Sequence, residues 1–104
     1  MATATTFDVL AEPMRRRILD LLLDRERPVG ELVKRLKLSQ PGVSKHLRVL
    51  REAGLVSVRS DAQRRIYGVR PEPLQEVAEW LEPYRKLWGE RLDALARHLD
   101  EEAR

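Results

Sequence analysis

The feature that most constrains this chain is a change of hydrophobic period at Gly54. Before this glycine, apolar residues recur at the spacing of one helix face, namely Val43, Leu47, Leu50 and Ala53. After it, apolar and polar residues alternate over positions 56–59, as in a strand with one buried face. Glycine takes the left-handed conformation at little cost, so it can end a helix and let the chain turn directly into a strand. The sequence therefore predicts a helix followed at once by a β-hairpin, with SDAQ as its tip and RRIYGV as its return strand.

The start of this helix suits a close approach to another molecule. Ser39 can cap it, because the hydroxyl oxygen can accept a backbone N–H of the first turn. Pro41 is tolerated only in that turn, and Gly42 has no side chain to keep a neighbour away. The outward face of the helix is polar and basic, and it comprises Gln40, Ser44, Lys45, Arg48 and Arg51. His46 lies at the border of this face, where a hydrogen-bonded packing role is expected.

Helical spacing also predicts three helices before this segment. The first is short and capped by Thr5 or Thr6. The second has Pro13 in its first turn, where the missing N–H has no helical partner to lose. The third follows Pro28 and ends at Leu36, so that only a short turn separates it from the helix that starts at the predicted serine cap.

After the hairpin the pattern is helical again, with an interruption expected near Pro83. The order of elements is then α-α-α-α-β-β-α(α), which is mainly α with a small β-hairpin. This order describes a winged helix-turn-helix, with the helix-turn-helix over 28–54 and the wing over 55–70. We expect one domain that spans residues 1–104.

Positive charge is concentrated in the middle of the chain. Residues 34–70 carry ten Lys and Arg against two acidic side chains, whereas the whole chain has a formal net charge of only +3. The flanking segments, 1–33 and 71–104, are each net negative. A basic middle between acidic ends predicts a face that binds a polyanion.

The second helix of a helix-turn-helix can enter the DNA major groove with its N-terminal end first. Gln40 is the candidate for reading a base edge, because its amide can both donate to adenine and accept from it. Ser44 lies one turn further along the same face, while Lys45, Arg48 and Arg51 suit phosphates or guanine. The predicted partner is therefore double-stranded DNA.

Other classes of function find no support in the residues. No apolar run approaches the ~18 residues of a membrane span, and no basic segment followed by an apolar stretch opens the chain, so we expect a soluble, cytoplasmic protein without membrane contact. No nucleophile elbow, glycine-rich phosphate loop or apolar carboxylate pair is present, so we expect neither an enzyme nor a cofactor. The alternative function is a winged helix that binds another protein and has no operator, and the ten cations over 34–70 argue against it.

Three segments carry a family resemblance: FDVLAEPMRRRILDLL, VGELVKRLKLSQPGVSKHLRVLREAGLV and RRIYGV. In them the chain resembles the ArsR/SmtB family of bacterial winged-helix transcription regulators, over nearly its whole length. The resemblance implies a homodimeric repressor that binds an operator, with the fourth helix in the major groove and the wing on flanking DNA. A twofold dimer in turn predicts a near-palindromic operator. The predicted DNA-binding residues are Ser39, Gln40, Pro41, Gly42, Ser44, Lys45, His46, Arg48, Arg51, Arg59, Arg64 and Arg65.

The chain departs from the family pattern in its metal-binding residues. Many members sense metals through a cysteine-rich ELCVCDL-type box, but the matching stretch here is ELVKRL, with Val33 and Arg35 at the cysteine positions. Valine cannot ligate a metal, and a guanidinium repels a cation. A second family site uses His and carboxylates of the C-terminal helix, for which His98, Glu101 and Glu102 share one helix face. A solvated helix end is the preferred interpretation of these three residues, so we expect no metal site.

Both ends of the chain carry more large apolar side chains than so small a domain can bury. We expect the segments 5–12 and 72–102 to form a subunit interface, although this apolar stripe could instead line a ligand cavity. The predicted interface residues are Phe7, Leu10, Tyr84, Leu87, Trp88, Leu92, Leu95 and Leu99. No residue pattern indicates the operator sequence, the regulated genes, a small-molecule effector, or whether transcription is repressed or activated.

Overall fold

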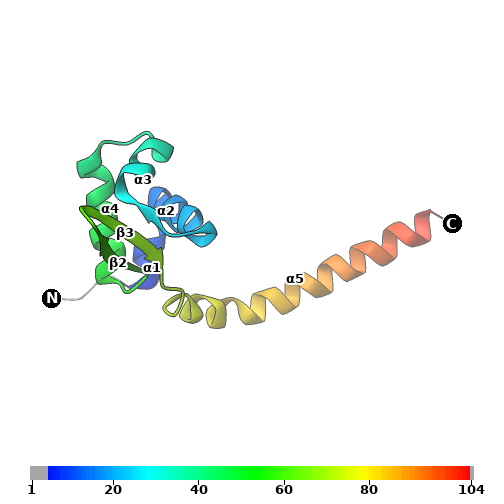
Figure 1. Ribbon diagram of the computed structural model, residues 1–104. Helices are drawn as coiled ribbons and strands as arrows, with labels where there is room; N and C mark the ends of the chain where they lie inside the picture. The colour runs from blue at the N-terminus through cyan, green and yellow to red at the C-terminus, as the bar shows by residue number, and fades with distance from the viewer. Residues whose placement is uncertain (1–4, 104) are drawn as a thin grey trace.

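The structure is a computed structural model, and it describes residues 5–103. Its elements are α1 (Thr6–Leu10), α2 (Pro13–Asp24), β1 (Arg27–Pro28), α3 (Val29–Leu36), α4 (Gln40–Glu52), β2 (Val56–Asp61), β3 (Arg64–Val69) and α5 (Leu74–Glu102). The predicted fold class is confirmed: the chain is mainly helical and has the helix-turn-helix and the wing in the expected order (Figure 1). The ends of the predicted domain, residues 1–4 and 104, lie outside the described residues.

The hydrophobic core lies between α2, α3, α4 and one face of the sheet. The largest fully buried side chains are Val9, Ile18, Leu32, Val43, Leu47, Leu50, Leu55 and Val56. Full burial of a side chain of this size contributes about 1.5–3 kcal/mol, and α4 alone supplies three of these residues. The inner face of α4 is thus firmly anchored, and its outer face stays free.

The predicted boundaries of α4 are confirmed. Ser39 Oγ accepts the backbone N–H of Gly42 at 3.2 Å, which caps the first turn. At the other end Gly54 has a φ of 77°, in the left-handed region that ends helices. The Leu55 N–H donates to the Leu50 carbonyl at 2.9 Å, and only three residues separate the end of α4 from the start of β2.

The sheet has three antiparallel strands in the order β1-β3-β2, whereas the sequence predicted only the β2–β3 hairpin. In β1, Arg27 and Pro28 pair with Tyr67 and Ile66 of β3. A two-residue strand shows no alternation, and proline has no N–H to donate to a ladder and is tolerated only at an edge, so no sequence pattern marks β1. This strand ties the base of the wing to the segment between α2 and α3.

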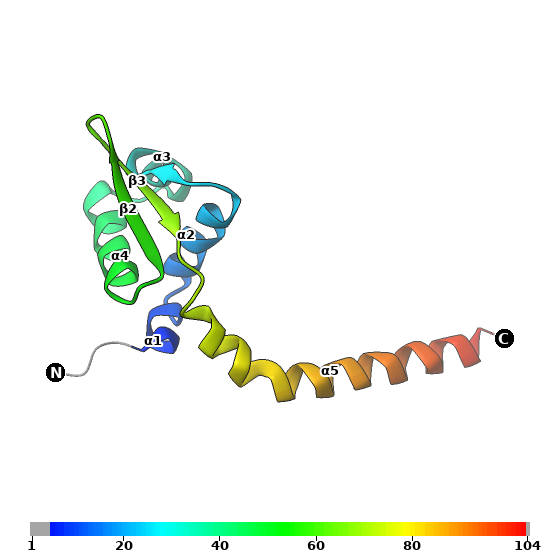
Figure 2. The same ribbon diagram turned by 60° about the horizontal axis from the view of Figure 1, so that its bottom comes forward.

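The hairpin is longer than predicted, and its turn is tighter. Ser60 and Asp61 were expected in the tip, but they belong to β2 and pair with Arg65 and Arg64. Only two residues form the turn, and the first of them, Ala62, has a φ of 56°, as two-residue hairpin turns require. The polar composition of SDAQ correctly predicted where the chain turns, but it does not show which of these residues still pair with the other strand. Figure 2 shows the hairpin projecting beyond the helices.

α5 is a single helix of 29 residues, so the predicted interruption near Pro83 is wrong. Proline removes one helical hydrogen bond, but every residue of α5 from Ala78 on is exposed, so the freed carbonyl can bond to water. The helix bends in its yellow part and then runs away from the body (Figure 2). The radius of gyration is 18.7 Å, against about 13 Å for a compact chain of this size. Within residues 5–103, no helix combines the length and apolar character needed to cross a membrane.

Candidate nucleic-acid interface

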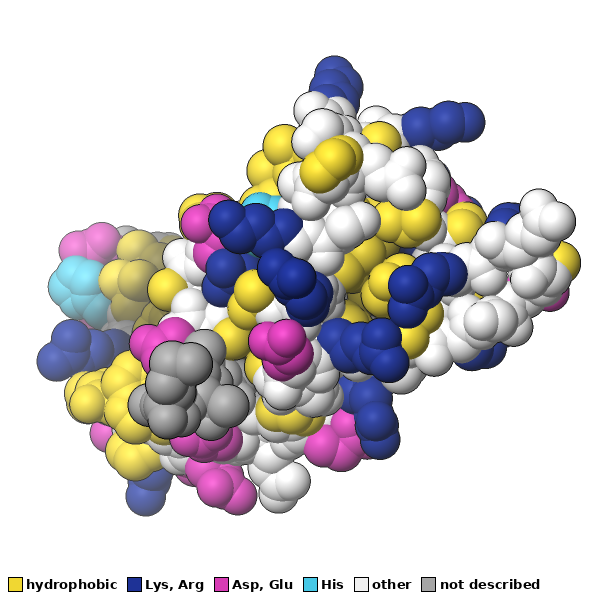
Figure 3. Space-filling model, turned by 90° about the vertical axis from the view of Figure 1, so that its left-hand side faces the viewer, with side chains coloured by type: hydrophobic (Ala, Val, Ile, Leu, Met, Phe, Trp, Pro, Cys, Tyr) yellow, Lys and Arg dark blue, Asp and Glu magenta, His cyan; other side chains and the backbone are white. Residues whose placement is uncertain are grey.

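The outer face of α4 presents the predicted contact residues to solvent. Gln40, Ser44, Lys45, Arg48 and Arg51 are all exposed, and Pro41 lies beside them in the first turn. Because Ser39 caps the helix and Gly42 adds no side chain, this end of α4 is narrow. Figure 3 shows Lys and Arg side chains gathered on the side of the molecule that carries α4 and the wing.

A hollow of about 510 Å³ separates α4 from the wing. The α4 side of the hollow is lined by Gln40, Ser44, Lys45, Arg48 and Arg51, and the wing side by Arg65 and Tyr67 of β3. Its cations come from two elements that face each other, and Arg48, Arg51 and Arg65 have no acidic partner within ion-pair distance among the described residues. The hollow therefore suits a phosphate backbone that passes between α4 and the wing.

A second hollow, of about 650 Å³, lies on the other side of Gln40, between the start of α3 and the wing tip. It is lined by Lys34 of α3 and by Gln63, Arg64 and Arg65 of the wing. Sequence reasoning did not assign Lys34 or Gln63 to the interface. Lys34 belongs to the basic middle segment, but nothing in the sequence places it opposite the wing tip.

The strand register divides the three wing arginines between two faces. Side chains alternate along a strand, so Arg65 shares the face of Tyr67 and the core, whereas Arg59 and Arg64 lie on the opposite face. Arg64 pairs with Asp61 at 3.3 Å near the tip, and Arg59 pairs with Glu26. Only Arg65 thus faces α4 directly.

His46 is half-buried and connects α4 to the first two helices. Its Nδ1 accepts a hydrogen bond from Arg15 Nε at 3.3 Å, and Arg15 Nη1 also donates to the Val9 carbonyl at 3.3 Å. Arg15 was missed by sequence reasoning, because its partners are 6 and 31 positions away.

Arg27 is a buried arginine that connects the end of α2 to α3. Arg27 is 3% exposed and donates to the Leu21 carbonyl at 2.9 Å, to Asp24 at 3.0 Å and to Glu31. Partial burial would raise the pKa of Glu31, but hydrogen bonds and charge from Arg27, Arg25 and Arg35 outweigh this and lower it. This cluster joins the end of α2 to α3.

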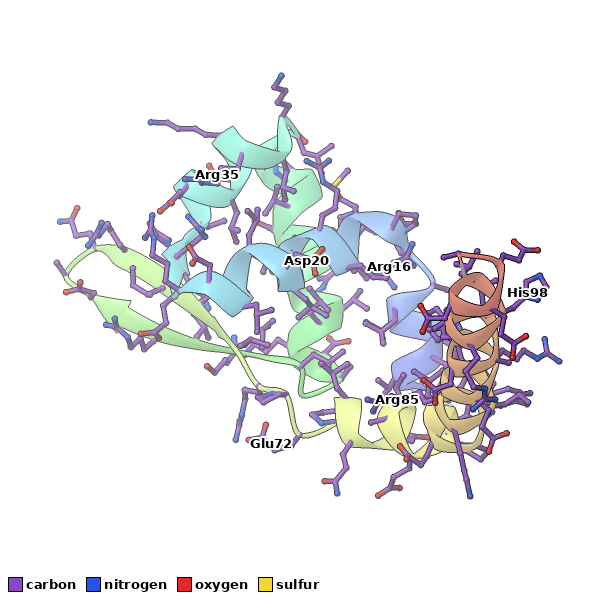
Figure 4. The ribbon with its side chains drawn as sticks, turned by 90° about the vertical axis from the view of Figure 1, so that its right-hand side faces the viewer. Arg16, Asp20, Arg35, Glu72, Arg85 and His98 are labelled. Atoms are coloured by element: carbon purple, nitrogen blue, oxygen red, sulfur yellow. The ribbon has the colours of Figure 1, made fainter. Side chains whose placement is uncertain are left out.

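The metal-site candidates remain at the far end of α5. His98 Nε2 lies 3.0 Å from Glu102 Oε1, and Glu101 is not part of this contact. Figure 4 shows His98 pointing outward near the end of the helix. Among the described residues, no group of three or more potential ligands could hold a metal. On α3, Arg35 lies 3.4 Å from Glu31 and occupies a position where the family's metal box has cysteine.

The predicted interface residues of α5 project into solvent. Tyr84, Leu87, Trp88, Leu92, Leu95 and Leu99 are all exposed. Phe7 is 40% exposed and packs edge-on against Trp80, with the two ring centroids 5.7 Å apart. Leu10 is half-buried against the core of its own chain. Trp80 and Leu81 are also exposed and extend the apolar stripe beyond the residues predicted.

The fold and this basic face define a DNA-binding transcription regulator of the winged helix-turn-helix class. The family described as "Bacterial regulatory protein, arsR family" matches residues 12–58. The crystal structure of Rv0081 from Mycobacterium tuberculosis superposes with a TM-score of 0.64 at 36% identity, and it covers 83% of this chain and 88% of that one.

Relatives of similar sequence agree with this class. Over 75 residues the chain is 41% identical to the regulator Rv0081, a match that covers 71% of this chain and 66% of that protein. The transcriptional repressor SdpR of Bacillus subtilis is 31% identical, and the match covers 72% of this chain and 83% of SdpR. The transcriptional activator HlyU of Vibrio cholerae is 43% identical, and the match covers 69% of this chain and 67% of HlyU. The chain belongs to the ArsR family of bacterial transcription regulators.

Proposed function

We propose that this chain is a homodimeric repressor that binds a near-palindromic operator through α4 and the wing. The observation that carries the proposal is the pairing of two surfaces. One is the exposed polar and basic face of α4, anchored by a fully buried inner face. The other is the exposed apolar stripe of α5, which needs a partner.

The exposure of α5 supports the dimer. None of its 29 residues is buried, and Trp88 is 67% exposed. Soluble monomers avoid a continuous apolar surface of this extent. At 1.5 Å per residue the helix is about 43 Å long, more than the body of its own chain can cover. A second copy with the same stripe offers a matching surface, and self-complementary contact gives a twofold dimer.

A dimer also supplies enough sequence recognition. One recognition helix reads only a few base pairs, too few to select one site in a genome. Two copies related by a twofold axis would place their α4 helices about one DNA turn apart, ~34 Å, on a site with matching symmetry.

Within each half-site, we assign base reading to Gln40, with Ser44 beside it. Lys45, Arg48 and Arg51 are assigned to phosphates or guanine. The Ser39 cap, Pro41 and Gly42 let the end of α4 enter the groove, and His46 supports α4 from its half-buried side.

In the wing, Arg64 and Arg65 are assigned to flanking phosphates, and Lys34 joins them through the shared hollow. Repression is proposed because the relative SdpR, which is 31% identical, is named a transcriptional repressor. A bound dimer would act by occupying the promoter.

The proposal is tested by selecting genomic DNA fragments that the purified protein binds, and by sequencing them. We expect a near-palindromic consensus whose half-sites are one helical turn apart, and lower expression of a reporter when the fragment overlaps its promoter. Arg48→Ala should abolish selection, whereas Arg85→Ala, which removes the same charge on α5, should leave it unchanged. Fragments without a consensus, or equal loss in both variants, would contradict the proposal.

A further inference from the structure

An ion pair crosses the outer face of the wing. Arg59 of β2 lies on the face opposite the core, together with Gly68 of the central strand β3. Glu26 directly precedes β1, and its carboxylate reaches over β3 to the guanidinium. Arg59 Nε donates to Oε2 and Nη2 donates to Oε1, both at 3.3 Å. The pair therefore links β2 to the segment that leaves α2, across the strand between them.

Gly68 leaves room for this crossing. A Cβ at that position would lie 3.3 Å from both Cγ and Oε2 of Glu26, so the carboxylate would have to move. The two-point contact between planar groups fixes direction as well as distance, because both donors must align with both acceptors. The carboxylate of Glu26 also raises the pKa of the Arg59 guanidinium.

We propose that Glu26 and Arg59 form a positioning pair for the wing, and that Arg59 makes no contact with DNA. The pair holds β2 against the body, so that the hairpin tip keeps its direction relative to α4. The phosphate contacts of the wing then come from Arg65, which lines both hollows, and from Arg64, which lines the hollow between α3 and the wing tip. This inference rests on the proposed function, because it assumes that the wing tip reaches the DNA that flanks α4.

The first arm of the test compares two neutralised arginines on a selected operator fragment. Arg59→Gln and Arg64→Gln each remove one charge from an ion pair of the same 3.3 Å length. For Arg64→Gln we expect the slope of log K against log salt to become shallower by about 0.9 per lost phosphate contact. For Arg59→Gln the slope should stay unchanged, and affinity should fall about twofold to fivefold, since freeing the wing can cost no more than an exposed ion pair stabilises. A shallower slope for Arg59→Gln would overturn the proposal.

The second arm exchanges the two charges. Arg59→Glu alone and Glu26→Arg alone should each weaken DNA binding, whereas the double variant restores the pair in reverse and should bind within about twofold of the parent. If the double variant binds as poorly as Arg59→Glu, the cation at position 59 touches DNA and the proposal is wrong.

Unfolding measurements without DNA separate the proposed positioning pair from the proposed DNA-binding function. Unfolding of Glu26→Gln, Arg59→Gln and their double variant forms a double-mutant cycle that needs no DNA. We expect the double change to destabilise less than the sum of the single changes. Additive effects would refute the positioning pair even if the protein binds its operator. Absence of any selected operator, together with a coupled cycle, would refute the proposed function and leave the pair in place.

Discussion

Replacing Arg27 with Met tests whether the buried arginine holds α2 and α3 together. Methionine keeps most of the apolar stem but removes all three donations, to the Leu21 carbonyl, Asp24 and Glu31. Breaking a buried ion pair by removing one partner costs about 3–5 kcal/mol. Here the cost should lie at the low end of this range, because Asp24 is 74% exposed and Glu31 keeps Arg25 and Arg35.

The largest remaining penalty is the Leu21 carbonyl, whose lost hydrogen bond costs about 1–3 kcal/mol if it stays buried. Adding part of the ion-pair loss, we expect Arg27→Met to lower the free energy of unfolding by about 3 kcal/mol. That is a large share of the ~5–15 kcal/mol that stabilises an ordinary domain.

Urea unfolding followed by circular dichroism measures this change, at one protein concentration because the stability of the proposed dimer would depend on concentration. Arg25→Met is the matched control: Arg25 also bonds to Glu31, but its side chain is 55% exposed, so its loss should cost much less. Equal destabilisation by the two variants, or a loss below about 1 kcal/mol for Arg27→Met, would refute the reasoning.

Three further outcomes follow from the same structure. Gln40→Ala should lose ~1–3 kcal/mol of discrimination at one base step per half-site, with nonspecific affinity unchanged. Competition binding with operator and random DNA measures this. Equal losses of affinity for the two DNAs would show that the assignment is wrong. Trp88→Glu with Leu92→Glu should give monomers or unfolded chains without operator binding, as sedimentation would show, and a double variant that still dimerises would exclude this interface. The lowered pKa of Glu31 contributes stability above its unfolded value of about 4.3 that is lost as pH falls through the lowered folded value. Glu31→Gln should therefore flatten the acid limb of the unfolding free energy against pH, and an unchanged limb would contradict the cause given.

Local rules predicted the helix-turn-helix well. The Ser39 cap, the apolar stripe of α4 and the left-handed Gly54 depend on residues within a few positions of one another, so the sequence alone identifies them. Near Pro83 a local rule failed, because the effect of a proline on a helix depends on whether water can reach the freed carbonyl.

The supporting contacts of the interface could not be predicted, because they join residues far apart in the chain. Glu26 and Arg59 are separated by 33 positions, and Arg15 and His46 by 31. The wing arginines look alike in the sequence, and only the register of β2 on β3 shows that Arg65 faces α4 while Arg59 does not.

The central claim is that two copies of α4 and the wing hold a DNA duplex largely through its phosphates. The most direct test is the equilibrium affinity for a selected operator fragment over a series of salt concentrations. If a dimer neutralises about eight phosphates, log K against log salt should fall with a slope near −7, at about 0.9 per phosphate. A slope shallower than about −2 would contradict the claim, because it would correspond to fewer phosphate contacts than even one basic face would make.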